Sequence, residues 1–314
     1  MERTEWLARR RQGIGGSDVA AILGLSPWKT ALDVYNDKTG VPNDEPETEN
    51  MKIGTALEQF VADRFTEMTG RKTSKYNTLL KKGVCIGNVD RLVVPDGQRL
   101  GSHHDEIRTD ELLECKTSST EWPDDVPAHY LAQVQHYMGL FDGFQRATVA
   151  CLFLGFQKRM ALYTIERDDD LIKSMQAACE RFWTEHVLAH VPPAPQNEAD
   201  CRALWTAHEA GKVVDGDAAL LDVAKELKAT SAQIAELEAK EKDLRSKLMG
   251  ALGDGETLTA GGVKICTWKN NKPSSKVDWQ GLAGSLNPTD EQLAAFTAVK
   301  PGARVFRLAA NLGE

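Results

Sequence analysis

A short apolar segment, residues 112–117, carries two residues of opposite charge and alternates in the way of a β-strand. In a strand, Glu114 and Lys116 project from one face, while the residues beside them project from the other. Burying a carboxylate and an ammonium on an apolar strand is costly unless something pairs them. A divalent metal ion would do so, because Asp90 and Glu114 supply hard oxygen ligands and the Cys115 backbone carbonyl can add another. Lys116 would then orient or activate a water molecule.

The pattern of an Asp followed by Glu-x-Lys is typical of metal-dependent nucleases, but three residues are weak evidence on their own. The same letters fit a solvated edge strand whose Glu and Lys face water. An upstream helix favours the metal site, because residues 53–68 place Glu58 beside an apolar stripe, where it could reach the metal or border the core. The stripe consists of Leu57, Phe60, Val61, Phe65 and Met68.

A second predicted helix, residues 127–138, carries two glutamines. At 3.6 residues per turn, Gln133 and Gln135 differ in direction by about 200°. Only one of them is therefore expected to point at the site, where its amide would hold a water molecule or the backbone of a substrate.

Four short motifs follow one another in the first half of the chain, and together they resemble the YqaJ-type viral recombinase nucleases, the family of phage lambda exonuclease. The resemblance covers roughly residues 5–190, and residues 11–28 resemble the opening motif of that family. Val89 stands where the family often has Pro, a departure that leaves the neighbouring ligand in place. The four motifs are Gly-Thr-Ala-Leu-Glu at 54–58, Gly-Asn-Val-Asp at 87–90, Glu-Cys-Lys at 114–116 and Ala-Gln-Val-Gln-His-Tyr at 132–137.

The resemblance implies an α/β (α+β) fold with a PD-(D/E)xK nuclease core, in which helices flank a mixed β-sheet. It implies a Mg²⁺-dependent exonuclease, with Mn²⁺ able to substitute, that degrades the 5′ strand of linear double-stranded DNA and leaves a 3′ overhang. The expected partner is a single-strand annealing protein, and the expected assembly is a ring-shaped homotrimer. The expected location is the cytoplasm of a bacterial host, with phage or prophage origin.

The resemblance also assigns roles to single residues of this chain. The expected catalytic residues are Glu58, Asp90, Glu114 and Lys116. The expected metal ligands are Asp90, Glu114 and the Cys115 carbonyl, with Glu58 bound directly or through water. The expected substrate contacts are Arg11, Ser17, Asn88, Gln133 and Gln135.

A glycine-rich segment, residues 13–18, precedes the first predicted helix. Glycines ahead of a Ser/Asp N-cap let the N–H groups of the helix start face outward, which suits a phosphate, and Arg11 could add a bidentate contact. On these residues alone, a plain capped helix fits equally well. The resembled family binds the 5′-phosphate of DNA in this region, so Arg11 and Ser17 are expected to do so here.

Composition sets weaker limits on function. The formal net charge is −8, although phosphate binding calls for Lys and Arg. Bases nevertheless cluster at residues 9–11, 71–82 and 263–276. Six cysteines lack zinc-type spacing, so buried, reduced thiols explain them better than disulfides or a metal site. The longest apolar run, residues 147–156, is too short for a membrane span.

Three parts are predicted along the chain: a nuclease core at 1–190, a proline-marked linker at 191–216 and an extension at 217–314. Expected core elements are helices from residues 17, 55 and 128 and at 168–188, with strands around 84–94, 112–117, 146–156 and 158–166. Residues 217–249 carry a heptad pattern without Pro or Gly, which predicts one long helix rather than several short ones. A β-hairpin is predicted at 256–269.

The basic and aromatic residues of the extension either grip DNA or only keep the hairpin soluble. They are Lys264, Trp268, Lys269, Lys272 and Lys276. Two other functions stay open for the whole chain: an endonuclease of restriction or junction-resolving type, and a DNA-binding assembly module with a vestigial site.

Overall fold

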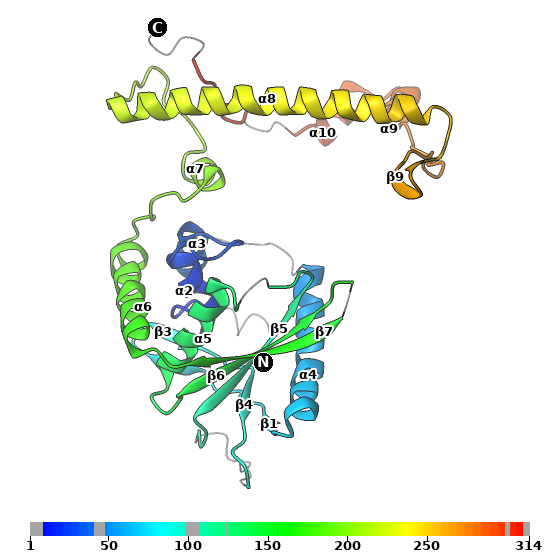
Figure 1. Ribbon diagram of the computed structural model, residues 1–314. Coiled ribbons are helices and arrows are strands. Elements are labelled where there is room, and N and C mark those ends of the chain that lie inside the picture. Colours follow the sequence, from blue (N-terminus) through cyan, green and yellow to red (C-terminus); the bar gives the residue numbers. More distant parts are fainter. Residues whose placement is uncertain are drawn as a thin grey trace. The chain divides into compact units, whose positions relative to one another are not determined.

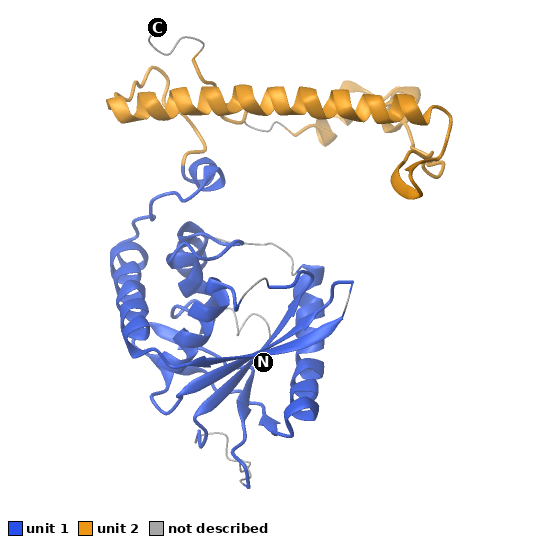
Figure 2. Cartoon of the chain, in the orientation of Figure 1, with its two compact units in different colours: residues 1–204 blue, residues 205–314 orange. Residues whose placement is uncertain are grey.

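The computed structural model describes residues 9–40, 48–97, 107–122, 125–156, 158–298 and 302–309. The chain divides into two compact units, residues 1–204 and residues 205–314 (Figure 2). The first unit extends beyond residue 190 and includes helix α7, Glu198–Leu204.

The first unit is built on a five-stranded mixed sheet with the strand order β1-β4-β5-β6-β7. β5 and β6 run parallel, and the other neighbouring pairs are antiparallel. The prediction of a mixed sheet flanked by helices is confirmed. The strands are β1 (Thr73–Ser74), β4 (Arg91–Val93), β5 (Glu111–Ser118), β6 (Arg146–Phe153) and β7 (Arg159–Glu166).

Helices cover both faces of this sheet (Figure 1). α4 (Glu49–Thr69) packs on one face, where Val61 and Phe65 meet alternate residues of β5 and β6. The larger apolar core lies on the other face, beneath α2 (Gly16–Ile22), α5 (Ala128–Leu140) and α6 (Asp169–Phe182). Because side chains alternate along β5, Leu113 belongs to the α4 layer and Leu112 to the α5 layer.

The apolar stripe predicted on α4 is partly wrong. The helix begins at Glu49 rather than at residue 55, and Thr48 caps it by accepting the N–H of Met51. Phe60 and Met68 are each 48% exposed, whereas Val61 and Phe65 are buried. α4 rests on a single sheet face, and consecutive residues turn by about 100°, so only a narrow arc of the helix reaches that face.

The strand predicted around residues 84–94 is divided in two. β2 (Leu80–Lys82) and β3 (Cys85–Gly87) form a separate hairpin, and β4 begins only at Arg91. Gly83 has φ +60° in the hairpin turn, a conformation that favours glycine. The intervening residues, 88–90, join no strand, which places Asp90 directly at the start of β4.

Two other helical segments differ from their prediction. α3 (Ala31–Thr39) is missing from the predicted elements, although Thr30 and Asp33 form a capping box at its start and Gly40 closes its end. The helix predicted at 168–188 is α6 followed by a π-helical turn, η1 (Trp183–Leu188).

The second unit contains the predicted long helix, α8 (Ala218–Leu252), and the predicted hairpin, β8 (Thr257–Ala260) with β9 (Val263–Thr267). Two short helices follow, α9 (Trp279–Ser285) and α10 (Asp290–Phe296). Heptad residues of α8 such as Leu220, Ile234 and Leu237 are more than half exposed. Among the described residues, no helix is both long enough and apolar enough to cross a membrane.

Candidate active site

Glu114 and Lys116 project from β5 toward α5, as the alternation of the strand predicted. β5 lies between β4 and β6, and Glu114 is only 2% exposed, so the alternative of a solvated edge strand is wrong. The Lys116 ammonium donates to Glu114 Oε1 at 2.6 Å and to Gln133 Oε1 at 2.9 Å. The charged pair is therefore tied to a residue of α5.

Asp90 reaches the same place from the start of β4. β4 pairs with β5 only as far as Arg91 opposite Leu113. Beyond that point, Asp90 Oδ2 accepts the N–H of Cys115 at 2.8 Å. The N–H and C=O of one strand residue point to the same edge of the strand, so the Cys115 carbonyl lies on the edge where Asp90 sits.

One oxygen of Glu114 lacks a partner. Among the described residues no group forms a hydrogen bond with Glu114 Oε2, although this oxygen is buried. Buried carboxylate oxygens are almost always satisfied in folded proteins, and an ion is one accepted explanation of an exception. A hard divalent cation therefore fits this site. Its ligands would be Glu114 Oε2, the nearby Asp90 carboxylate and the Cys115 carbonyl.

The protonation behaviour of Asp90 and Lys116 agrees with a divalent cation at this site. Burial, and then the charge of Glu114, raise the pKa of Asp90 to about 8. Burial opposes charge on Lys116, but Glu114 and Asp90 outweigh it and raise the pKa of the ammonium. Lys116 is therefore a cation at neutral pH, suited to orienting a nucleophile and offsetting negative charge rather than to removing a proton.

Glu58 lies at the border of this cluster. Its carboxylate pairs with the buried guanidinium of Arg91, which also donates to the Asp90 carbonyl at 2.6 Å. Glu58 contributes to the raised pKa values of Asp90 and Cys115, so it lies within electrostatic reach of both. Arg91, which sequence reasoning missed, holds Glu58 beside the proposed ligands.

Only one glutamine of α5 faces the site, as helical geometry predicted. Gln133 accepts from Lys116 and donates to the Tyr137 hydroxyl at 2.9 Å. Gln135 lies apart from the cluster: it donates to the Glu166 carbonyl at 2.7 Å and accepts the Asp168 N–H at 3.0 Å. The expected contact of Gln135 with substrate is therefore replaced by a structural bridge from α5 to the end of β7.

Two aromatic residues of α5, Tyr130 and Tyr137, make contacts at the site that were not predicted from the sequence. Lys116 Nζ lies 4.8 Å from the centre of the Tyr130 ring, a cation–π contact. Tyr137 packs against Gly16, where an added Cβ would lie 2.7 Å from the ring. The only sequence signal for these contacts is the periodicity of α5, which does not distinguish a site residue from a core residue.

The glycine-rich segment differs from its prediction in two respects. The N-cap of α2 is Gly15, which has no side chain to cap the helix, and Asp18 accepts the Gly15 N–H at 3.0 Å. The arginine beside Ser17 is Arg10, which donates to the Ser17 hydroxyl at 3.3 Å. Arg11 instead points to Asp37 at 4.0 Å. The side chains of these two arginines differ in direction, because the helix that includes residues 9–10 gives way to a turn at residues 11–12.

Two pockets connect this segment to the carboxylates. The first is lined by Arg9, Arg10, Gly15, Gly16, Ser17, Asn77, Leu79, Ile86, Gly87, Asn88 and Tyr137. The second is lined by Glu58, Lys75, Tyr76, Asn77, Asn88, Val89, Asp90 and Arg91. Asn77 and Asn88 line both pockets. Of these two, only Asn88 was expected from the sequence to contact substrate.

Comparison with known proteins places the chain in a family. The sequence profile of the YqaJ-like viral recombinase domain matches residues 5–142. The YqaJ protein of Bacillus subtilis (strain 168) is 34% identical over 310 residues, which cover 95% of this chain and 92% of the relative.

Solved structures with similarity to this chain include two exonucleases. An alkaline exonuclease from Laribacter hongkongensis matches with a TM-score of 0.45 and 20% identity, over 60% of this chain and 94% of its own. A phage-related exonuclease from Haemophilus somnus 129PT matches with a TM-score of 0.39 and 14% identity, over 59% of this chain and 99% of its own. The predicted relationship is confirmed by the near full-length match to the Bacillus subtilis protein: the chain belongs to the YqaJ-like viral recombinase family.

Proposed function

We propose that this chain is a divalent-metal-dependent exonuclease that degrades the 5′ strand of linear double-stranded DNA and leaves a 3′ overhang. The observation that carries the proposal is the unpartnered, buried Glu114 Oε2 beside Asp90, with Lys116 bound to the other oxygen of Glu114. Family membership and the two exonucleases named above agree with a nuclease. Mg²⁺ is the proposed ion because all proposed ligands are oxygens, and Mn²⁺ is expected to replace it.

Each residue has a proposed role. Asp90, Glu114 and the Cys115 carbonyl would hold the ion, with Glu58 near enough to bind through water. The bound ion would lower the pKa of water and polarise the scissile phosphate. Lys116 would orient the attacking water and offset the charge of the pentacovalent transition state. Gln133 would fix the position of Lys116 through the hydrogen bond that it accepts.

The proposed preference for DNA ends rests on the pocket beside α2. A pocket that Arg9, Arg10 and Ser17 line suits a terminal phosphate, because cationic side chains and a hydroxyl are the usual partners of phosphate oxygens. Its shared wall with the pocket at Asp90 supports a path for one DNA strand from its 5′ end to the scissile bond. An annealing protein as partner, a homotrimeric ring, and action in the cytoplasm of a bacterial host belong to the same proposal.

Strand polarity and end dependence are tested together on three substrates. The first two are linear duplexes labelled on either the 5′ or the 3′ end of one strand, and the third is a covalently closed circle. With Mg²⁺, we expect the 5′ label to be released first, the 3′-labelled strand to shorten from its far end, and the circle to survive. Cutting of the circle would support an endonuclease instead. Unaltered substrates in all three reactions would support a DNA-binding module with a vestigial site.

A further inference from the structure

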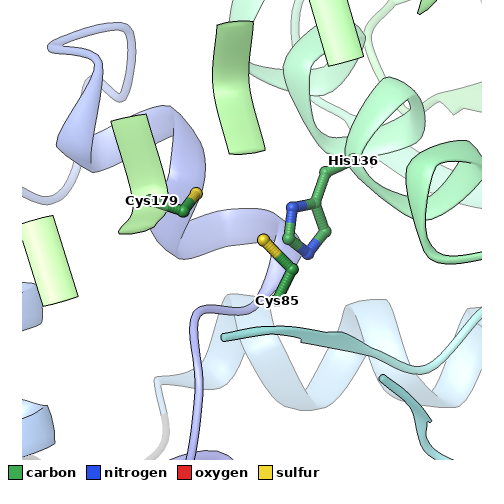
Figure 3. Close-up of side chains that lie close together, drawn as sticks. All are labelled: Cys85, His136 and Cys179. Carbon is green, nitrogen blue, oxygen red and sulfur yellow. The ribbon is translucent and has the colours of Figure 1, made fainter. Parts of the chain in front are cut away.

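A second group of metal-binding side chains lies inside the first unit. Cys85 on β3, His136 on α5 and Cys179 on α6 present one sulfur or nitrogen atom each, and these atoms all lie within 4.8 Å of one another (Figure 3). Cys85 is 2%, His136 3% and Cys179 0% exposed. The three side chains converge from three elements that are far apart in the sequence, so the spacing of the cysteines alone gave no sign of a metal site.

The hydrogen bonding of His136 prepares one ring nitrogen as a ligand. His136 Nε2 lies 2.9 Å from the Ile86 carbonyl. A carbonyl oxygen only accepts, so Nε2 must carry the proton, and in a neutral imidazole Nδ1 then has a free lone pair. Metal-binding histidines are usually fixed in this way, through a bond from the second ring nitrogen to a backbone carbonyl or a carboxylate.

We propose that Cys85, Cys179 and His136 Nδ1 bind a zinc ion that joins β3, α5 and α6. Two sulfurs and one imidazole nitrogen are the ligand types that select zinc over Mg²⁺. In a tetrahedral site with Zn–S bonds of about 2.3 Å, ligand atoms lie about 3.5–3.8 Å apart, so the observed cluster needs only a small contraction. Binding would displace the thiol protons to solvent and leave both sulfurs as thiolates.

Glu180, the residue after Cys179, is not part of the cluster: it is exposed, and its carboxylate lies against the β2–β3 turn at Gly83.

The cluster lies close in sequence to residues of the candidate active site, so a zinc ion there would help to hold those residues in place. Cys85 lies five residues before Asp90, and His136 lies one helical turn after Gln133. Ile86 and Gly87, next to Cys85, line the pocket beside α2. A zinc ion here would clamp the β2–β3 hairpin to α5 and α6, and so fix the elements that carry Asn88, Asp90 and Gln133.

Cobalt substitution tests the site on the unmodified chain. The full chain, purified with a reductant and without a histidine tag, is depleted of metal and titrated with Co²⁺ in excess Mg²⁺, which occupies the oxygen site. We expect a thiolate-to-cobalt charge-transfer band and strong visible bands of tetrahedral cobalt, saturating at one ion per chain. A titration that yields only the weak bands of six-coordinate cobalt would overturn the proposal, whatever the nuclease activity is.

Zinc content gives an independent measurement. The wild-type chain expressed with added zinc is expected to retain about one zinc per chain after gel filtration, whereas Cys85→Ala and Cys179→Ala lose it. Cys151→Ala is the matched control, because Cys151 is a buried, free thiol outside the cluster, and it should keep the zinc. Equal zinc content in Cys151→Ala and both cluster variants would contradict the assignment, as would a wild-type chain without zinc.

Discussion

Lys116 Nζ lies 2.6 Å from Glu114 Oε1, while Glu114 Oε2 remains buried without a partner among the described residues. The ammonium thus bonds to one oxygen of the carboxylate and leaves the other oxygen available to a second positive charge. A single ion pair in a core would be expected to use both oxygens, because an unsatisfied buried oxygen costs about 1–3 kcal/mol. The arrangement is explained when a cation occupies the remaining position.

Replacing a proposed ligand should remove both metal binding and cleavage. We expect Glu114→Gln to leave the fold intact, to weaken Mn²⁺ binding measured by calorimetry, and to reduce cleavage to background. Lys116→Met, in contrast, should lower kcat by roughly 10²–10³-fold while Mn²⁺ binding persists, because Lys116 stabilises charge rather than the ion. Near-normal turnover in Glu114→Gln would remove the proposed site.

The two glutamines of α5 form a matched pair of variants. Gln133→Ala should lower kcat, because Lys116 loses one of the two acceptors that fix it. Gln135→Ala should cost about 1–3 kcal/mol of stability, since it leaves backbone groups of Glu166 and Asp168 unpaired. Chemical denaturation and single-turnover cleavage measure both effects. The reverse pattern, with Gln135 affecting catalysis alone, would show that the wrong glutamine was assigned to the site.

Arg10, rather than Arg11, should confer a preference for 5′-phosphorylated ends. We expect Arg10→Lys, which keeps the charge beside Asp18, to reduce the ratio of kcat/KM for 5′-phosphate over 5′-hydroxyl ends. A lost charge-assisted bond is worth roughly a 10- to 100-fold change. Arg11→Ala is the control, because Arg11 points to Asp37 and is half exposed. If Arg11→Ala alone abolishes the preference, the pocket beside α2 does not hold the phosphate.

Asp18 should control the acid stability of the first unit. Burial opposes its charge, but the nearby Lys38 and Arg10 hold the pKa of Asp18 well below its ordinary value of 3.8. Lys38 Nζ lies 2.7 Å from Asp18, and both side chains are almost fully buried. The stabilisation is therefore complete above the unfolded pKa near 4 and is lost as the pH falls below it.

Denaturation at several pH values checks this account. At neutral pH, Asp18→Asn should cost about 3–5 kcal/mol, because it leaves the Lys38 charge buried without its main partner. Between about pH 5 and pH 2, the variant should lose less stability than the wild-type chain. Asp142→Asn, which breaks an exposed pair with Lys82, should have little effect at any pH. Parallel pH curves for Asp18→Asn and the wild type would contradict the assignment.

The second unit should contribute to DNA grip or partner docking, and not to chemistry. All proposed ligands lie in the first unit, residues 1–204. Replacing the four lysines at 264, 269, 272 and 276 by Gln should shorten the DNA tract degraded per binding event and flatten the salt dependence of binding. Single-turnover cleavage should barely change. A loss of single-turnover cleavage in this variant would place the second unit in the catalytic step.

The sequence predicted those features that depend on local periodicity. Strand alternation placed Glu114 and Lys116 on one face of β5, and the heptad pattern gave α8 as a single helix. Helical geometry showed that Gln133 and Gln135 could not both face the site. Which of them does so depends on how α5 packs against β5, and that is a tertiary property.

Features that depend on contacts between distant segments could not be predicted. The choice of Arg10 over Arg11 follows from the turn at residues 11–12 and from the buried Asp18–Lys38 pair, because Arg10 also pairs with Asp18. The cluster of Cys85, His136 and Cys179 joins three elements, so no spacing rule identifies it. The narrow buried arc of α4 was likewise set by the single sheet face on which that helix rests.

The most direct test of the central claim is anomalous diffraction from crystals of the full chain soaked with Mn²⁺. We predict an anomalous peak within bonding distance of Glu114 Oε2, Asp90 and the Cys115 carbonyl, and its disappearance in crystals of Glu114→Gln. Mn²⁺ bound elsewhere, with Glu114 Oε2 still unpartnered in well-ordered density, would contradict the metal site from which the proposed nuclease activity is derived.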